Sequence, residues 1–185
     1  MKKFLLTALV AVVSLTANAQ FWAGGSIGAS TSKTTFDGED LEKANTVSIN
    51  PTVGYSISDN LDVALELAYA HGDSDSKNIN AFGFRPFVRY TFVKSGNFKV
   101  FADGGFGYAN IHTSGVKDNT NNWEIFIRPG ISYDLTKKVY LTATVGDLNY
   151  QFSKTGDLKT NAFNLDLDSK VSFGVNVRLL VTVSD

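Results

Sequence analysis

Leu61-Asp-Val-Ala-Leu-Glu-Leu-Ala-Tyr-Ala70 alternates large apolar residues with small or charged ones. A strict period of two is typical of a β-strand, because successive side chains of a strand point to opposite faces of the sheet. Leucine, valine and tyrosine therefore share one face of this segment, and aspartate, glutamate and alanine share the other. The segment predicts a strand with one apolar face and one polar or small face.

The same alternation recurs along the chain, at residues 21–30, 47–57, 82–92, 98–108, 123–133, 139–145 and 171–183. Between these segments, short polar connections alternate with longer ones. The short connections are 58–60, 94–97 and 134–138, and the longer ones are 32–45, 72–78, 113–122 and 153–161. Consecutive strands joined in this way form an up-and-down antiparallel meander. We predict an all-β, eight-stranded barrel with tight turns at one end and four longer loops at the other.

The period of two does not show which face of the barrel points inward. In a soluble barrel the apolar face is inside, whereas in a membrane barrel it meets lipid and aromatic residues lie at both interfaces. Aromatic residues gather near the strand ends on the apolar face, which favours a transmembrane barrel. Segments of roughly ten residues also suffice to cross an apolar band of about 25 Å. The aromatic girdles that we predict contain Tyr55, Tyr69, Tyr90, Phe98, Tyr108, Trp123 and Tyr133.

The opposite face carries charges of both signs. Charges in a narrow interior must pair, because an unpaired buried charge is costly. The interior ion-pair network that we predict consists of Glu66, Arg85, Arg89, Asp103, Glu124 and Arg128. Hairpin register across the connection 94–97 sets Arg89 opposite Asp103. The same face also carries Asp62, Lys99, Asp166, Asp168, Lys170 and Arg178.

All three prolines of the chain share one sequence frame. Pro51, Pro86 and Pro129 each lie within apolar-x-Pro-x-apolar-x-Tyr-x-apolar, in every second strand, four residues before a tyrosine. Proline donates no hydrogen bond to a sheet, so we expect a local bulge and a missing ladder bond at each site. The frame marks the strands that run toward the tight turns.

Residues 1–19 have the pattern of a secretory signal peptide, which leaves a barrel domain at 20–185. Lys2 and Lys3 precede the apolar stretch 4–15, and Ala17-Asn-Ala19 forms a small-x-small cleavage site. The chain has no cysteine, so neither a disulfide nor a cysteine metal site is available to it. A formal net charge of −1 argues against a nucleic-acid partner.

With these features the chain resembles the small outer-membrane β-barrel proteins of the OmpA and OmpX type, often grouped as porin-family proteins. The resemblance rests on the leader, the eight alternating segments, the turns and loops, and the last strand Lys170-Val-Ser-Phe-Gly-Val-Asn-Val-Arg-Leu179. It implies the outer membrane of a Gram-negative-type bacterium, with both termini in the periplasm. The expected partners are outer-membrane lipids and lipopolysaccharide, the barrel-assembly machinery, periplasmic chaperones, and a host or surface ligand bound through the loops. We expect a monomer without a metal or cofactor. The family's final strand usually ends in an aromatic residue, whereas this chain ends in Asp185.

The leading functional hypothesis is a non-enzymatic barrel with a polar, side-chain-filled interior, whose loops serve envelope integrity, adhesion or another surface interaction. One alternative is a lipid A deacylase-type enzyme that uses His112 and Ser114, with Glu124 as the carboxylate. His112-Thr-Ser114 is similar to the His-x-Ser signature of lipid A 3-O-deacylases, although Gly115 replaces the asparagine that commonly follows. A second alternative is a narrow channel for small solutes. Small residues on the inner face would leave space for a channel; they are Gly105, Gly107, Ala109 and Gly130. Large aromatic residues on the same face favour a plugged lumen; they are Phe87, Phe101 and Phe126.

Overall fold

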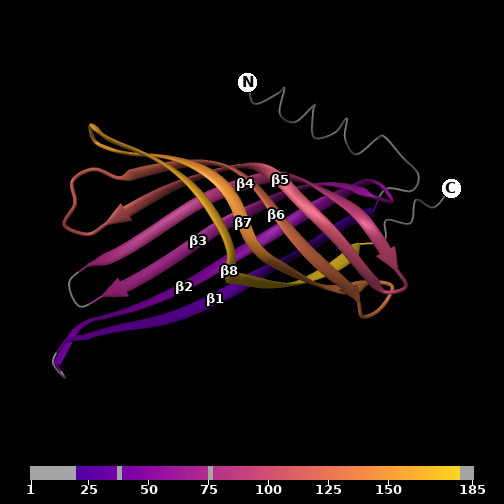
Figure 1. Ribbon diagram of the computed structural model, residues 1–185, viewed down its shortest axis with the longest axis horizontal. Helices are drawn as coiled ribbons and strands as arrows, with labels where there is room; N and C mark the ends of the chain where they lie inside the picture. Colours follow the sequence, from indigo (N-terminus) through magenta and orange to yellow (C-terminus); the bar gives the residue numbers. More distant parts are fainter. Residues whose placement is uncertain (1–19, 37–38, 75–76, 180–185) are drawn as a thin grey trace.

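The computed structural model describes residues 20–36, 39–74 and 77–179. The signal peptide expected at residues 1–19 lies outside these residues. The described chain forms a closed antiparallel barrel in which each strand pairs with the next, and β1 pairs with β8 (Figure 1). The strands are β1 (Gln20–Phe36), β2 (Glu39–Ser58), β3 (Leu61–Ser74), β4 (Asn78–Ser95), β5 (Phe98–Thr113), β6 (Thr120–Asp134), β7 (Val139–Thr155) and β8 (Leu158–Leu179). The eight-stranded up-and-down barrel predicted from the sequence is confirmed.

The two ends of the barrel differ in their connections. At one end, called here the turn end, residues 59–60, 96–97 and 135–138 join consecutive strands, as the sequence predicts. At the opposite loop end, residues 114–119 join β5 and β6. Two of the expected long loops are wrong. At 32–45, β1 continues to Phe36 and β2 begins at Glu39, and the two strands pair along this stretch. At 153–161, β7 continues to Thr155, β8 begins at Leu158, and only Gly156 and Asp157 lie between them. Gly156 has a φ of 57°, which permits this tight turn.

The apolar face of the alternating pattern points outward. Leu65, Leu67 and Tyr69 of β3 are 38%, 40% and 46% exposed, whereas Trp22, Phe87 and Phe101 are at most 5% exposed. The buried rings form an aromatic core inside the barrel, and the exposed apolar side chains form its outer surface. Among the described residues there is no helix of sufficient length and apolarity to cross a membrane.

Each proline interrupts the ladder on the side of the following strand. Pro51 pairs with Gly25 of β1, but the β2·β3 pairing passes from Ile49 directly to Thr52. The β4·β5 pairing likewise omits Pro86, without any change of register. Of the three prolines, only Pro129 lies at a register shift, which falls between Ile127 and Gly130 of β6. The expected bulge is therefore present at one proline, and the other two sites accommodate the missing N–H by an interrupted ladder alone.

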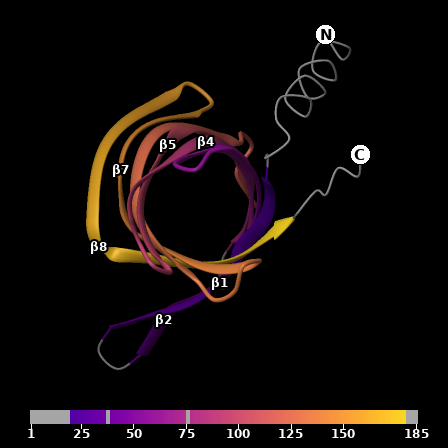
Figure 2. The ribbon, with the colours of Figure 1, turned by 90° about the vertical axis from the view of Figure 1, so that its right-hand side faces the viewer.

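The seam that closes the barrel is short. β1 pairs with β8 only from Phe21, opposite Leu179, to Gly25, opposite Val175. Beyond this point the described residues of β1 pair with β2 alone, and those of β8 pair with β7 alone. Viewed along the barrel, the β7–β8 hairpin bows outward on one side and the β1–β2 hairpin projects away below it (Figure 2).

Candidate functional site

The interior of the barrel is crossed by ion pairs between directly opposed residues of neighbouring strands. Arg89 of β4 lies opposite Asp103 of β5, which lies opposite Arg128 of β6. The Arg89 guanidinium binds the Asp103 carboxylate through two hydrogen bonds, from Nε to Oδ1 at 2.7 Å and from Nη2 to Oδ2 at 2.9 Å. Asp103 is fully buried, at 0% exposure. A bidentate pair in this setting both compensates the two charges and fixes the geometry of both side chains.

The remaining charges extend this pair into a continuous chain. Arg128 contacts Asp103 at 3.5 Å and Glu66 of β3 at 3.7 Å, in each case through Nη2. Arg85 of β4 contacts Glu66 at 3.4 Å through Nη1 and Glu124 of β6 at 2.5 Å through Nε. The resulting order alternates in sign and sums to zero formal charge: Glu124, Arg85, Glu66, Arg128, Asp103 and Arg89. The structure thus brings together all six residues that the sequence assigned to the interior network.

Aromatic rings fill the space around the guanidinium groups. The Arg89 guanidinium carbon lies 3.8 Å from the Phe101 ring centroid and 5.6 Å from that of Trp22. Arg128 lies 5.3 Å from the Phe126 ring centroid. Contacts of this kind are favourable because the ring face is electron-rich. Gly130 makes room for them, since a Cβ there would lie 2.4 Å from the Phe101 ring.

Sequence reasoning missed two of the interior rings. Trp22 is 2% exposed and Tyr140 is 6% exposed, and their ring centroids are 6.2 Å apart in an edge-on arrangement. A signal for Trp22 was present, because it falls on the small-residue face of β1. It lies opposite Gly54 of β2, where a Cβ would be 2.1 Å from the indole.

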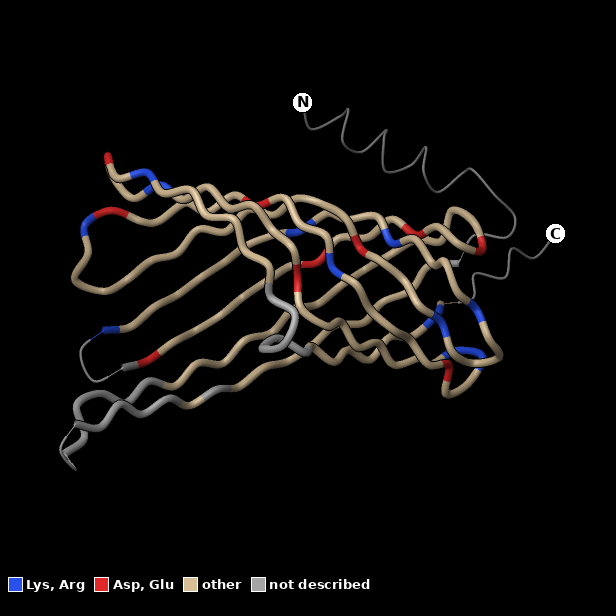
Figure 3. Tube along the Cα trace, viewed as in Figure 1, with Lys and Arg blue, Asp and Glu red and all other residues tan. Residues whose placement is uncertain are grey.

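A second group of charges lies at the turn end. Asp134 binds Arg178 at 2.6 Å and Lys99 at 2.9 Å. These residues line a cavity of about 660 Å³ that opens at this end and reaches inward to Arg89 and Phe101. Figure 3 shows charged residues at both ends and across the middle of the barrel. Three further residues placed on the inner face by the sequence, Asp166, Asp168 and Lys170, have side chains outside the described set.

The structure gives the three candidate catalytic residues separate partners. His112 Nδ1 lies 2.9 Å from Asn119 Oδ1, and Ser114 Oγ accepts a hydrogen bond from the Asn78 amide at 2.8 Å. Glu124 is buried inside the barrel with Arg85, whereas His112 is exposed. No serine, histidine and carboxylate triad is formed by these residues. Within the described ranges there is also no group of three metal-binding side chains.

Most residues assigned to the aromatic girdles lie exposed on the outer surface. The exposed ones are Tyr69, Tyr90, Phe98, Trp123 and Tyr133. Tyr108 is half-buried and packs on Trp123, with 4.4 Å between ring centroids. Tyr55 differs, because it is only 7% exposed and packs against Phe21 at 5.0 Å, although it shares a face with the exposed Val53. Their assignment to the membrane interfaces stays a prediction.

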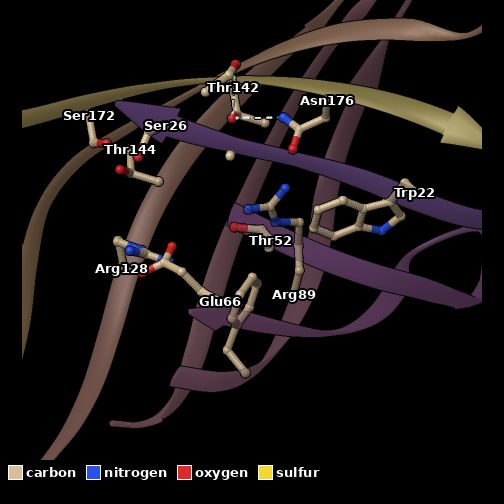
Figure 4. A pocket seen from close by; sticks show the side chains of 13 residues that line it. Trp22, Ser26, Thr52, Glu66, Arg89, Arg128, Thr142, Thr144, Ser172 and Asn176 are labelled. Atoms are coloured by element: carbon tan, nitrogen blue, oxygen red, sulfur yellow. Dashed lines mark hydrogen bonds and ion pairs between the residues drawn. The ribbon is translucent and has the colours of Figure 1, made fainter. Parts of the chain in front are cut away.

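A polar chamber separates the ion-pair network from the β1·β8 seam (Figure 4). It has a volume of about 40 Å³, which is room for very few water molecules. Its seam side is lined by hydroxyl and amide groups, among which Asn176 donates to Thr142 Oγ1 at 3.1 Å. An adjoining cavity of about 170 Å³ extends from Arg128 to Ser26 and Ser172 at the seam.

An outward apolar surface, a closed strand order and a charged interior together define an integral membrane β-barrel. The family described as outer membrane protein beta-barrel domain matches residues 4–170, and the chain belongs to this family. Membership places the protein in the outer membrane of a Gram-negative-type bacterium.

Several solved outer-membrane barrels share the fold. Neisserial surface protein A is 17% identical with a TM-score of 0.53, and the match covers 89% of this chain and 98% of that one. OprG from Pseudomonas aeruginosa is 16% identical with a TM-score of 0.55, over 88% and 97% of the two chains. A major outer membrane protein from Thermus thermophilus is 11% identical with a TM-score of 0.51, over 88% and 100%. At these identities the likeness shows the fold alone. Comparison with curated proteins gives no match.

Proposed function

We propose that the protein is a non-enzymatic outer-membrane barrel whose interior is closed to solutes and whose loop end interacts with the cell surroundings. The observation that carries this conclusion is the alternating chain from Glu124 to Arg89, which spans β3 to β6 and is packed with aromatic rings. A filled, charge-neutral interior of an eight-stranded barrel stabilises the barrel and leaves no continuous lumen. Function then depends on what the barrel presents at its ends.

The absence of an axial path is tested by electrical recording. The cavity of about 660 Å³ at the turn end reaches Arg89 and Phe101, and the chamber beyond them has only about 40 Å³. We expect purified protein in planar bilayers to give no steady open conductance. Arg85→Ala/Glu124→Ala, which removes a neutral pair and its volume, should give brief or small openings in the same preparation. A steady conductance of the parent protein would refute the closed interior.

The loop end offers a polar surface for a ligand. A cavity of about 540 Å³ there is lined by Asn110, Lys117, Asp118, Asn119, Asn121, Lys154 and Gly156. Amide and ammonium groups in one concave surface suit a ligand rich in hydroxyl or phosphate oxygens, such as a surface saccharide. A deletion strain complemented with the parent gene or with the Asn119→Ala/Lys154→Ala gene should separate a role in envelope integrity from a role in surface binding. Envelope integrity should be restored by both genes, whereas surface binding should be restored by the parent alone; equal binding by both would remove this cavity from the proposal.

The orientation in the membrane is also proposed, with the turn end in the periplasm and the loop end outside. Short turns on the periplasmic side and longer connections outside are the usual arrangement of bacterial outer-membrane barrels. An epitope inserted after Gly115 should be accessible to antibody on intact cells, and one inserted after Gly96 should require permeabilisation. The reverse pattern would contradict this orientation.

A further inference from the structure

The barrel wall is incomplete between β1 and β8. The seam register pairs Gly25 with Val175, and its continuation would set Ile27 opposite Phe173 and Gly28 opposite Ser172. The structure shows no such β1·β8 pairs among the described residues, although both strands continue. Gly25, where the pairing ends, has a φ of 153°, a conformation that residues with side chains rarely adopt. A strand edge exposed to lipid is costly, because its backbone groups find no water to bind there.

The two edges of this opening carry unusually exposed apolar side chains. Ile27 is 84% exposed and Phe173 is 72% exposed, the two highest values among the large apolar residues described. Exposed apolar residues continue past the opening along β8, at Leu165 and Phe163. The opening therefore begins within the apolar outer surface and faces lipid hydrocarbon.

Behind these apolar edges the surface becomes polar. The cavity of about 170 Å³ is lined near the seam by Ser26, Thr144 and Ser172 and farther in by Arg85, Arg128 and Glu66. Asp147 also lines it, and its Oδ1 accepts a hydrogen bond from Asn149 at 2.6 Å. Figure 4 shows the three hydroxyl-bearing side chains grouped on one side of the chamber, with Arg128 beside them. A path from apolar edges to hydroxyl groups and then to a guanidinium matches a molecule with a hydrocarbon chain and a small polar head.

Arg128 is the arginine of the network whose donors are least satisfied. Both of its carboxylate contacts use Nη2, at 3.5 and 3.7 Å, whereas Arg89 forms two hydrogen bonds below 3.0 Å. Arg128 Nε is buried and has no hydrogen-bond partner among the described residues. A guanidinium with free donor capacity beside two serine hydroxyls favours an anionic oxygen ligand.

We propose that the seam is a lateral binding site for a long-chain fatty acid. Its acyl chain lies between Ile27 and Phe173 in the membrane, and its carboxylate accepts hydrogen bonds from Ser26, Ser172 and the Arg128 guanidinium. The cavity of about 170 Å³ has room for the carboxylate. The site needs no axial pore, so it goes beyond the function proposed above and does not depend on the loop end.

Quenching of Trp22 fluorescence tests this site directly. The chain has two tryptophans, so Trp123→Phe leaves Trp22 as the only one. Trp22 is 2% exposed and lines the same chamber as Ser26, Arg128 and Ser172, away from the lipid. Bromine quenches tryptophan only at short range. In lipid nanodiscs, 2-bromopalmitate should quench Trp22, because its bromine is next to the carboxylate, and 16-bromopalmitate should not.

A matched pair of variants controls for lipid partitioning. Ser172→Phe fills the cavity and should abolish the quenching, whereas Ser95→Phe makes the same change in an exposed residue at the turn end and should preserve it. The uncharged methyl ester of 2-bromopalmitate should quench weakly. The site would be overturned if 2-bromopalmitate failed to quench the Trp22-only protein, or quenched its Ser172→Phe variant equally well. Quenching by the methyl ester or by 16-bromopalmitate as strong as that by 2-bromopalmitate would also overturn it.

Discussion

The two sides of the barrel interior bury polar groups in different ways. On the side of β3 to β6 the strands pair along most of their length, and the interior carries six charges in alternating ion pairs. On the side of the β1·β8 seam, the lining is mainly hydroxyl and amide groups, such as Thr142, Thr144, Ser172 and Asn176. Each of these charges has an oppositely charged partner, either on the neighbouring strand or across the interior. Neutral groups cost less to bury unpaired, so they suit a wall with an opening.

Because the β3 to β6 side depends on paired charges, removing one of them should lower the free energy of unfolding the most. Asp103→Ala leaves the Arg89 guanidinium buried without its bidentate partner, and it should lower the free energy of unfolding by about 3–5 kcal/mol. The urea midpoint, followed by the mobility of folded and unfolded barrel in gels, measures the loss. Arg89→Met/Asp103→Leu, which removes both charges, should recover most of the stability. An Asp103→Ala protein as stable as the parent would show that the pair is not formed.

The next largest effect is steric and concerns the glycines of the same side. Gly130→Ala places a Cβ 2.4 Å from the Phe101 ring and 2.9 Å from the Ala143 carbonyl oxygen. Overpacking of this kind should cost about 1–3 kcal/mol in unfolding free energy. Gly104→Ala is the matched control, because the nearest atom to its Cβ would be 4.0 Å away. If both variants unfold at the same urea concentration, the rings do not pack as the structure shows.

A smaller effect is expected on the seam side. Asn176→Ala removes the hydrogen bond to Thr142 and a largely buried amide, at a cost of about 1 kcal/mol. The same urea titration measures this difference. A loss as large as that of Asp103→Ala would mean that the two sides do not differ in the way described.

The smallest effect is expected for the ion pairs at the turn end. Asp134 binds Arg178 and Lys99, but its side chain is 21% exposed and the cavity around it is open. Asp134→Asn should therefore cost at most about 1 kcal/mol, and the cost should shrink as salt is added. A cost that is independent of salt would indicate that this group is shielded from solvent.

The comparison also shows what sequence reasoning can reach. The pairing of Arg89 with Asp103 followed from requiring both charged side chains to share the inner face. The turn alone would not give it, because Ser95 pairs with Phe98 beside the turn and a register shift between Thr91 and Val93 moves the pairing by one residue. The aspartate, glutamate and arginine residues of the network were identifiable because they fall on the face opposite the outward apolar one. The strand direction of β2, β4 and β6 followed from the frame around their prolines.

Other features depend on information that no local pattern contains. The seam joins the first and last strands, so its register and length depend on closure of the whole barrel. Serine, threonine and lysine occur both in loops and in the solvent-exposed parts of strands, which is why residues 153–161 were mistaken for a loop. A ladder can accommodate proline with or without a bulge, and only Pro129 lies at a register shift, close to Gly146 with its φ of 66°.

Disulfide formation across the seam tests the contrast between the paired and the open wall most directly. The parent chain has no cysteine, so introduced pairs can be read without background. Ala23→Cys/Val177→Cys lies within the paired seam and should oxidise readily to an intramolecular disulfide in the folded barrel. Ile27→Cys/Phe173→Cys, in line with the same register, should stay reduced because these edges are separated. Equal and rapid oxidation of both pairs would contradict an open wall and, with it, the lateral site.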